Sequence, residues 1–320
     1  MPRTIKEFKD MITTLTLNPC IDHTIEVEGI AFGGTNRIKN VKKDVGGKGI
    51  NVSTALKQLG YETRALVFSH EWEAVSVEDE LKRRGIPCER VFVPGELRTN
   101  LKLFDCNLQE MTEFNERGTP VLETAGEEMI SLIENVLPDT KILVLSGSVP
   151  PGISSDFYRK TIELVKKAGV RTILDADGEL FREGIKAKPT MIKPNRGELE
   201  RYLGKTLSLE KEIVEVATEL VKTGIPYVCV SVGADGAYLA CEEGVYHTKG
   251  AEIEVRGVQG AGDSLVAGFA IGLTEKRSPE ECLRLAVACA NGSLIHEGTE
   301  MCRREDVEKL IGEIEVRRIG

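Results

Sequence analysis

The sequence feature that most constrains this chain is the stretch GVQGAGDSLVAGFAIG at residues 257–272. Glycine and alanine crowd around a single carboxylate, Asp263, and a run of small and apolar residues follows it. This pattern predicts a glycine-rich turn that opens directly into a buried helix. The first N–H groups of such a helix have no intrahelical partner, and the helix dipole adds partial positive charge there. The turn is therefore predicted to bind an anion, because small side chains let a phosphate approach the backbone closely.

Asp263 needs a chemical reason to stand beside a bound anion, because its carboxylate repels that anion. The reason that we favour is proton abstraction from a hydroxyl group that attacks a phosphoryl group. A simpler interpretation is that Asp263 only caps the helix through its own side chain. Capping alone does not explain why so many small residues surround the carboxylate.

Composition and charge limit the class of protein. The chain has 320 residues, 41% hydrophobic and 29% charged, and can bury the core of a large soluble domain. Its net charge of −9 argues against nucleic acid or a membrane surface as the main partner. The eight cysteines contain no C-x-x-C pair, which favours reduced thiols in a cytoplasmic protein. We expect one domain over residues 11–320, with residues 1–10 as a polar N-terminal extension and no transmembrane helix.

Short β-branched runs alternate with helical periodicity along the chain. Strands are expected at residues 11–17, 63–69, 141–146, 171–175, 191–193 and 227–232. Helices are expected after residues 46–51, ending at Gly60, and at about 74–84, 124–136, 154–168, 195–203 and 209–223. Continuous apolar strands separated by helices indicate a mainly parallel sheet that is covered on both faces. Residues 237–255 predict a hairpin at one sheet edge, and three last helices are expected at 263–275, 279–296 and 303–315.

Two other segments, at about 20–44 and 90–118, contain shorter runs with alternating polar and apolar residues. Alternation indicates strands with one solvated face, so these are not central strands of a parallel sheet. We predict that the two segments pair into one small antiparallel sheet beside the main body. Such a sheet would serve as a lid or as a dimer surface.

Polar clusters follow the predicted strands, and ligands in open α/β sheets bind at the carboxyl ends of the strands. The clusters are Asn18 with Asp22, residues 146–152, Asp175 with Asp177, residues 193–198 and residues 231–236. Any one of them is a weak signal. Together, at one edge of one sheet, they predict a ligand site.

Each cluster also has a purely structural interpretation. Asn195 and Glu198 form the N-x-x-E pattern of a capping box, although a capping box at this edge can also serve a hydrated Mg²⁺. Residues 148–152 can be only a turn stiffened by prolines, and residues 231–236 only a hairpin connection.

Three cations suggest a phosphate ligand. Lys48 stands among glycines, where a cation has no evident structural role but could bind a phosphate. Arg98 and Lys102 are four residues apart in the predicted lid, so they can share one face of a strand. Solvated charges on an edge strand are the structural alternative for these two.

The sequence lacks other common nucleotide-binding and metal-binding motifs. Gly260-x-Gly262 is followed by Leu265, where a dinucleotide fingerprint needs a third glycine. No G-x-x-x-x-G-K-[ST] phosphate loop occurs, and the four histidines have no metal-ligand spacing.

With these motifs assembled, the chain resembles the PfkB (ribokinase-like) carbohydrate kinases over about residues 11–316. Two signatures carry the resemblance, at residues 46–53 and 258–269, and their joint occurrence at this separation is highly specific. The phosphosugar branch is most similar, on the evidence of TLNP at 16–19 with Asp22, GKGINV at 47–52, SGS at 146–148 and KPN at 193–195. The resemblance implies a three-layer αβα sandwich with a small antiparallel β-lid. It also implies a homodimer through that lid.

The resemblance further implies roles for particular residues. Asp263 would be the catalytic base, with Gly260, Ala261 and Gly262 as the anion hole. The sugar phosphate would be bound by Asp22, Gly47, Lys48, Asn51, Arg98, Arg37, Lys102 and Ser148. ATP would be bound by Lys193, Asn195, Glu198, Ser231, Gly233, Gly236 and Asn291. Glu198 would hold Mg²⁺ through water, with Asp175 as a further metal ligand.

Fructose 1-phosphate is the favoured substrate, because RTNLKL at 98–103 followed by TEFN at 112–115 is most similar to 1-phosphofructokinases. ATP-dependent phosphorylation would give fructose 1,6-bisphosphate and ADP. Tagatose 6-phosphate and fructose 6-phosphate are the alternatives within the family, and a non-catalytic sensor of sugar phosphates or nucleotides is the alternative of another class. Three departures from the family pattern stand out: Cys20 replaces a commoner alanine, Gln259 a small or aliphatic residue, and residues 70–73 a loop with glycine and aspartate.

Overall fold

The computed structural model describes residues 11–70, 76–108, 110–298 and 300–320. The expected N-terminal extension over residues 1–10 and residues 71–73 of the unusual loop lie outside this description. Within the described residues, no helix is long and apolar enough to cross a membrane.

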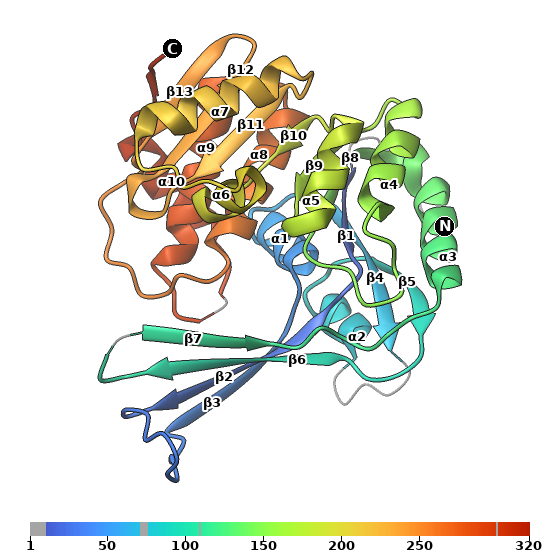
Figure 1. The fold of residues 1–320 in the computed structure, drawn as a ribbon, viewed down its shortest axis with the longest axis vertical. Coiled ribbons are helices and arrows are strands. Elements are labelled where there is room, and N and C mark those ends of the chain that lie inside the picture. The colour runs from blue at the N-terminus through green and yellow to red at the C-terminus, as the bar shows by residue number, and fades with distance from the viewer. Residues whose placement is uncertain (1–10, 71–75, 109, 299) are drawn as a thin grey trace, which may run out of the picture.

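A ten-stranded sheet forms the centre of the molecule, in the order β14-β13-β12-β11-β10-β9-β8-β1-β4-β5 (Figure 1). Its parallel part comprises β1 (Met11–Thr16), β4 (Thr63–His70), β5 (Cys88–Val93), β8 (Thr140–Ser146), β9 (Arg171–Asp175), β10 (Met191–Ile192) and β11 (Tyr227–Ser231). The antiparallel edge comprises β12 (Ala237–Cys241), β13 (Gly244–Thr248) and β14 (Arg317–Arg318). The expected parallel sheet and edge hairpin are both present.

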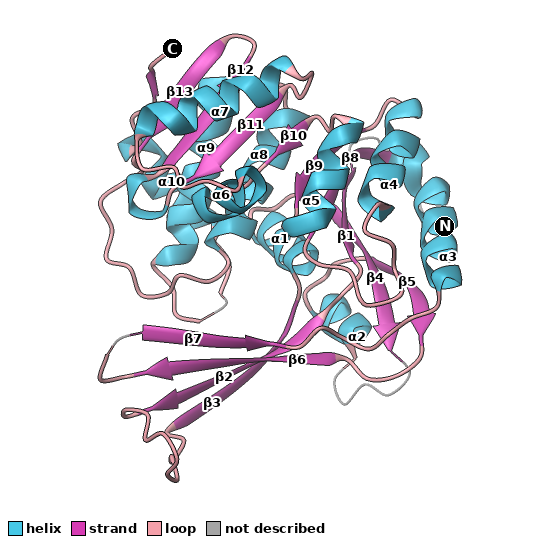
Figure 2. Ribbon diagram, in the orientation of Figure 1, coloured by secondary structure: helices cyan, strands magenta, loops and turns pink. Residues whose placement is uncertain are grey.

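Helices cover both faces of this sheet (Figure 2). One face packs against α1 (Lys48–Gln58), α2 (Val77–Arg83), α8 (Ala261–Thr274), α9 (Pro279–Leu294) and α10 (Arg304–Leu310). The other face packs against α3 (Glu123–Val136), α4 (Phe157–Lys167), α5 (Gly178–Gly184), α6 (Arg196–Leu203) and α7 (Glu210–Lys222). The predicted α/β architecture with a mainly parallel central sheet is confirmed.

Alternation along the strands assigns each side chain to one helical layer. Ile12 packs in the cluster that contains α1, α8 and α9, whereas Leu15 packs with α3 and α4. β1 is buried along its whole length, which explains why its sequence shows no polar face. The last expected helix, over 303–315, is shorter than predicted and ends at Leu310, just before Gly312, a poor helix former.

A second sheet projects from this core and contains β2 (Cys20–Val27), β3 (Asn40–Gly46), β6 (Arg98–Asp105) and β7 (Glu110–Asn115), in the order β3-β2-β6-β7 (Figure 2). We call this four-stranded sheet the lid. Its two outer pairs are antiparallel, as expected, but its central pair β2–β6 is parallel. Both central strands start at the core, where Cys20 lies beside Arg98, and run outward, so they point the same way.

The strand at 91–93 was expected in the lid but belongs to the central sheet. It is part of β5, which pairs in parallel with β4 at the edge of the ten-stranded sheet. An edge strand has a wet face, so its sequence alternates in the same way as that of a lid strand. The pattern alone could not separate the two locations.

Candidate active site

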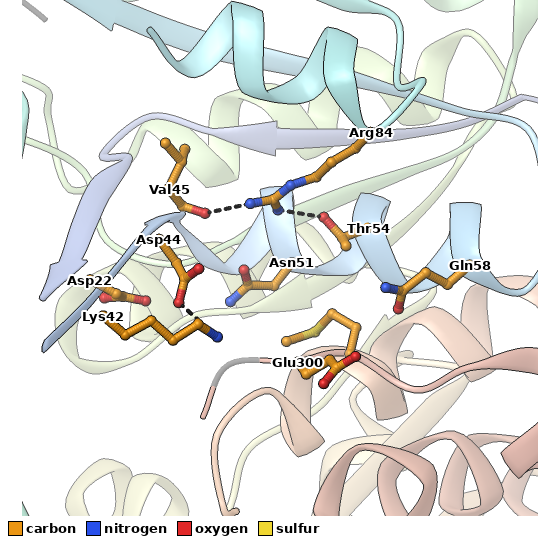
Figure 3. A pocket seen from close by; sticks show the side chains of 10 residues that line it. Asp22, Lys42, Asp44, Val45, Asn51, Thr54, Gln58, Arg84 and Glu300 are labelled. Atoms are coloured by element: carbon orange, nitrogen blue, oxygen red, sulfur yellow. Dashed lines mark hydrogen bonds and ion pairs between the residues drawn. The ribbon is translucent and has the colours of Figure 1, made fainter. Parts of the chain in front are cut away.

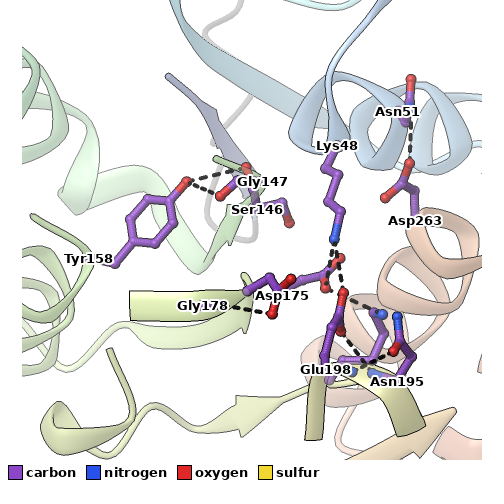
Figure 4. Close-up of polar contacts among 12 residues, drawn as sticks. Lys48, Asn51, Ser146, Gly147, Tyr158, Asp175, Gly178, Asn195, Glu198 and Asp263 are labelled. Carbon is purple, nitrogen blue, oxygen red and sulfur yellow. Dashed lines mark hydrogen bonds and ion pairs between the residues drawn. The ribbon is translucent and has the colours of Figure 1, made fainter. Parts of the chain in front are cut away.

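The polar clusters predicted at the strand ends do come together, opposite the N-termini of α1 and α8. Figure 4 shows Lys48 and Asn51 from α1, Asp263 from α8, and Asp175 at the end of β9 around one space. This is the carboxyl edge of the parallel strands, where open α/β sheets bind ligands.

Asp263 lies in the first turn of α8 and only 8% of its surface is exposed. The helix starts after Gly260, whose φ of +74° favours glycine, and a Cβ there would lie 2.2 Å from Met301 Cε. Gly260 holds the N-cap position, and among the described residues no side chain caps α8. The interpretation of Asp263 as only a helix cap is therefore wrong. Its Oδ2 instead accepts a hydrogen bond of 2.8 Å from Asn51 Nδ2.

Burial raises the pKa of Asp263 to about 6. Lys48 and the hydrogen bond from Asn51 lower this pKa in part, whereas the nearby charge of Asp175 adds to the rise. A carboxylate with a pKa near 6 is ionised at neutral pH and is still basic enough to accept a proton from an attacking hydroxyl group.

Two lysines and two carboxylates form a compact charged cluster beside Asp263. Lys48 Nζ and Lys193 Nζ each lie 3.3 Å from Asp175 Oδ1, and Lys48 Nζ is 3.9 Å from Glu198 Oε1. Asp175 is fully buried, and its Oδ2 has no hydrogen-bond partner among the described residues. Burial alone would raise the pKa of Asp175, but Lys193 and Lys48 hold it below its ordinary value.

Lys48 points toward this cluster and not toward the lid. It begins α1 after Gly47, where φ is +133° and a Cβ would lie 2.7 Å from Thr16 Cγ2. Burial tends to lower the pKa of Lys48, yet Asp175 and Glu198 raise it above its ordinary value. Lys48 is therefore a permanent cation at the edge of the sheet, beside the residues expected to bind ATP.

Asn195 and Glu198 form the expected capping box of α6. Asn195 Oδ1 accepts a hydrogen bond from Glu198 N, and Glu198 Oε2 accepts one from Asn195 N, both at 2.8 Å. The second oxygen of Glu198 faces Lys48. The capping interpretation is thus confirmed, and one carboxylate oxygen remains directed at the charged cluster.

The inner face of the lid contributes a second group of buried polar residues. Asp22 Oδ2 lies 3.0 Å from Lys102 Nζ, and Asp22 Oδ1 accepts a hydrogen bond of 3.2 Å from Asn100 Nδ2. Beside Asp22 and Asn51 is a cavity of about 190 Å³, which extends past Lys42 and Asp44 (Figure 3). The cavity has the polar lining that a sugar requires.

Arg98 and Ser148 meet at Asn18, a residue that follows β1. Arg98 Nε donates to Asn18 O at 3.1 Å, and Asn18 Nδ2 donates to Ser148 Oγ at 3.0 Å. Arg98 Nη1 also donates to Asn100 Oδ1 at 3.0 Å, so Arg98 and Lys102 do lie on the same lid face through Asn100. Asn18 was predicted from its position directly after a strand, as part of the polar cluster with Asp22, but its contacts with Arg98 and Ser148 were not predicted.

The remaining predicted residues lie further from this centre. Arg37 is exposed in the loop between β2 and β3, at the outer end of the lid. Ser231 bridges to Asn195 at the end of β11, and Gly233 and Gly236 form the connection to β12, as a hairpin would. Asn291 Oδ1 accepts from Ala251 N at 2.9 Å and so holds a loop. A contact of these residues with a nucleotide stays a prediction.

Gln259, the unusual residue before the anion-hole turn, contacts the lid. Its Oε1 accepts a hydrogen bond of 3.0 Å from Lys102 Nζ. The contact joins two segments that are 157 residues apart in the sequence.

Comparison with known proteins places these features in one family. The description "pfkB family carbohydrate kinase" matches residues 15–306. The chain is 33% identical to the 1-phosphofructokinase of Bacillus subtilis, over 97% of this chain and 100% of that protein. It is 30% identical to a tagatose-6-phosphate kinase of Staphylococcus epidermidis, over 96% of this chain and 99% of that one. The crystal structure of phosphofructokinase-2 from Escherichia coli in complex with substrates and products has a TM-score of 0.88, with 28% identity, and the match covers 94% of this chain and 98% of that one.

Proposed function

The chain belongs to the pfkB family of carbohydrate kinases, and we propose that it transfers the γ-phosphoryl group of ATP to the C6 hydroxyl group of fructose 1-phosphate. The products are fructose 1,6-bisphosphate and ADP. The full-length similarity to the 1-phosphofructokinase of Bacillus subtilis supports this substrate. Tagatose 6-phosphate is the second candidate, supported by the 30% identity to the tagatose-6-phosphate kinase.

The position of Asp263 is the observation that carries the proposal. Its buried carboxylate stands at the N-terminus of α8 and is oriented by Asn51. As the sugar hydroxyl attacks the γ-phosphorus, Asp263 accepts the hydroxyl proton, and the bond from the γ-phosphorus to the leaving ADP oxygen breaks. Backbone N–H groups of the turn at 260–263 stabilise the charge on the transferred group. A sensor that only binds ligands has no need for such a base.

Lys48 and Lys193 supply positive charge where the phosphates of ATP meet the sugar. A Cβ on Gly262 would lie 3.5 Å from Lys193 Nζ, so this ammonium group is at the mouth of the anion hole. Lys48 shares the Asp175 carboxylate with Lys193. We therefore assign Lys48 to the transferred phosphoryl group, and not to the phosphate already on the sugar.

The charged cluster suits Mg²⁺ as the companion of ATP. Asp175 Oδ2 has no partner among the described residues, and Glu198 Oε1 faces the same space. Mg²⁺ typically binds one or two carboxylates together with water and substrate phosphates. Asp175 and Glu198 would hold it, and it would neutralise charge on the nucleotide phosphates.

The sugar phosphate would bind between the lid and α1. Asp22 and Asn51 line the polar cavity and can bind hydroxyl groups of the sugar. Arg98 and Ser148, joined by Asn18, are then available for the phosphate that the sugar already carries. Closing the lid over this ligand would exclude water, which protects ATP from hydrolysis.

We also propose that the protein is a homodimer that forms through the lid and acts in the cytoplasm. All eight cysteines are free thiols, as a reducing compartment would keep them. The lid presents exposed apolar side chains at both of its edges, such as Val41 and Phe114.

A coupled assay of ADP release tests the proposed reaction. The purified protein is given MgATP with fructose 1-phosphate, fructose 6-phosphate, tagatose 6-phosphate, ribose or adenosine. We expect the highest kcat/KM with fructose 1-phosphate and formation of fructose 1,6-bisphosphate. Faster turnover of tagatose 6-phosphate would overturn the substrate, and binding without any ADP release would favour a sensor.

A further inference from the structure

Gln259 links the lid to the anion-hole turn through the polar contacts of Lys102. Lys102 Nζ lies 3.0 Å from Gln259 Oε1 and 3.0 Å from Asp22 Oδ2. Lys102 is 8% exposed and Asp22 is 4% exposed, so the contact between these two residues is shielded from water. The lid is thereby held against the segment that begins α8.

The amide of Gln259 has only one orientation that fits this contact. An ammonium group only donates hydrogen bonds, so the carbonyl oxygen Oε1 must face Lys102. The amide nitrogen Nε2 then points away from Lys102. It is buried and has no hydrogen-bond partner among the described residues. A buried donor without a partner costs free energy, which a bound ligand with an acceptor oxygen can recover.

The position of Gln259 indicates which class of ligand to consider. Gln259 is the residue before Gly260. Lys102 bridges its side-chain oxygen Oε1 to Asp22. Asp22 and Asn51 line the cavity assigned to the sugar, and Asn51 donates to Asp263. Gln259 therefore stands between Asp22, which lines the cavity assigned to the sugar, and the turn at 260–263, which is assigned to the transferred phosphoryl group. A small or aliphatic residue at this position could not bridge the two.

We propose that Gln259 is a substrate-binding and specificity-determining residue, whose Oε1 ties the lid to the anion-hole turn while its Nε2 donates to a hydroxyl oxygen of the bound sugar phosphate. The inference rests on the proposed sugar-phosphate kinase function. It predicts that one side chain couples closure of the lid to occupation of the sugar site. No proton or bond is transferred at Gln259, which acts only through hydrogen bonds.

Two variants separate the two halves of the amide. Gln259→Glu keeps an acceptor for Lys102 but removes the donor, whereas Gln259→Leu removes both. We expect Gln259→Glu to raise KM for fructose 1-phosphate about 3–10-fold with KM for ATP unchanged, as for the loss of one hydrogen bond. Gln259→Leu should raise this KM at least as much. It should also lower kcat, because the lid is no longer tied to the turn. Val258→Ala, a change at the exposed neighbouring residue, is the matched control and should behave as the wild type.

A Gln259→Leu enzyme with wild-type kcat and KM would overturn the inference. An unchanged KM in Gln259→Glu would overturn the donor role. Calorimetric titration of fructose 1-phosphate into wild type and Gln259→Leu separates this inference from the proposed reaction. If the wild type binds the sugar phosphate more tightly than Gln259→Leu but releases no ADP, the reaction fails and the inference holds. If the wild type neither binds nor phosphorylates any of the sugar phosphates, both fail.

Discussion

Asp263 accepts a proton in the proposed transfer, so removal of its charge should slow the chemical step more than it weakens binding. We expect Asp263→Asn to lower kcat by roughly 10²–10⁴-fold, with little change in the affinity for ATP. The amide can still contact Asn51, so the site should keep its shape. Steady-state kinetics and calorimetric titration with ATP measure the two effects. Near-normal kcat in this variant would show that Asp263 is not the base.

The pH dependence of the reaction should report the same carboxylate. Because burial raises the pKa of Asp263 to about 6, its basic form is lost below that pH. We expect kcat/KM to be level near neutral pH and to fall about tenfold per pH unit below about 6. The profile is measured with fructose 1-phosphate in buffers of constant ionic strength. If kcat/KM instead falls only near pH 4, the pKa of this carboxylate is not raised in the working enzyme.

The raised pKa also has a consequence for stability. The folded protein binds the Asp263 proton more tightly than the unfolded chain, whose ordinary pKa is 3.8. This group therefore makes stability fall as pH rises from about 4 to about 6, and it destabilises the fold above that range. Asp263→Asn should melt above the wild type at pH 7.5, and the difference should shrink at pH 5. Thermal unfolding at the two pH values checks the sign, and a lower melting temperature at pH 7.5 would contradict it.

For single residues, the sequence predicted which side chains lie at the site better than it predicted the side chains that they contact. Residue types and spacing placed Asp263, Asn195 and Glu198 at a ligand edge, because strand ends and helix starts are local features. The direction of Lys48 was not local. It depends on Asp175, 127 residues away, whose buried carboxylate attracts the ammonium group. The contact of Gln259 with Lys102 could not be predicted either, because Lys102 comes from the lid, 157 residues away in the sequence.

Helix α8 is built from small residues for packing as well as for anion binding. A Cβ on Gly268 would lie 2.5 Å from Ala286 Cα, so α8 and α9 touch backbone to backbone there. Gly268→Ala should therefore push the two helices apart and lower the free energy of unfolding by about 1–3 kcal/mol. Denaturant unfolding measures the loss. Gly312→Ala is the control, because a Cβ there meets nothing within 4 Å, and an equal loss in both variants would contradict the packing argument.

Elements were predictable where one physical signal dominated. The buried parallel strands were recognised because both of their faces are apolar. Helix α9 follows a clear start signal, since Ser278 Oγ accepts from Glu281 N and Pro279 stands at the first turn. β5 was misplaced because an edge strand and a lid strand share one pattern. The parallel pairing of β2 with β6 depends on where both strands leave the core, which no local pattern records.

For the whole molecule, the mainly parallel sheet and the two helical layers follow from alternation of strands and helices along the chain. What the pattern could not supply is the relation of the lid to the core. That relation includes contacts between residues far apart in the sequence, such as the one between Lys102 and Gln259. It decides which lid face meets the substrate and which face is left outward.

The outward face of the lid carries several apolar side chains, and this leads to a prediction about assembly. Asp22, Asn100 and Lys102 lie on the inner face, so the intervening residues of the same strands face outward. On that outer face Ile25 lies beside Val41, and Leu101 lies beside Phe114. Val41 is 49% exposed and Phe114 is 57% exposed. A second copy of the lid would bury this surface, and burial of apolar area is favourable by about 25 cal/mol per Å².

We therefore expect the wild type to be a dimer at micromolar concentration and the double variant Val41→Asp with Phe114→Asp to be a monomer. Two carboxylates on the outer face would have to be buried without partners in the dimer. The free energy required for this exceeds the free energy gained from burying the apolar surface. Light scattering after size-exclusion chromatography measures the mass. Leu122→Asp places one carboxylate at an exposed position outside the lid, at the start of α3, and should remain a dimer. A monomeric wild type, or a double variant that stays dimeric while its melting temperature is unchanged, would show that the lid is not the interface.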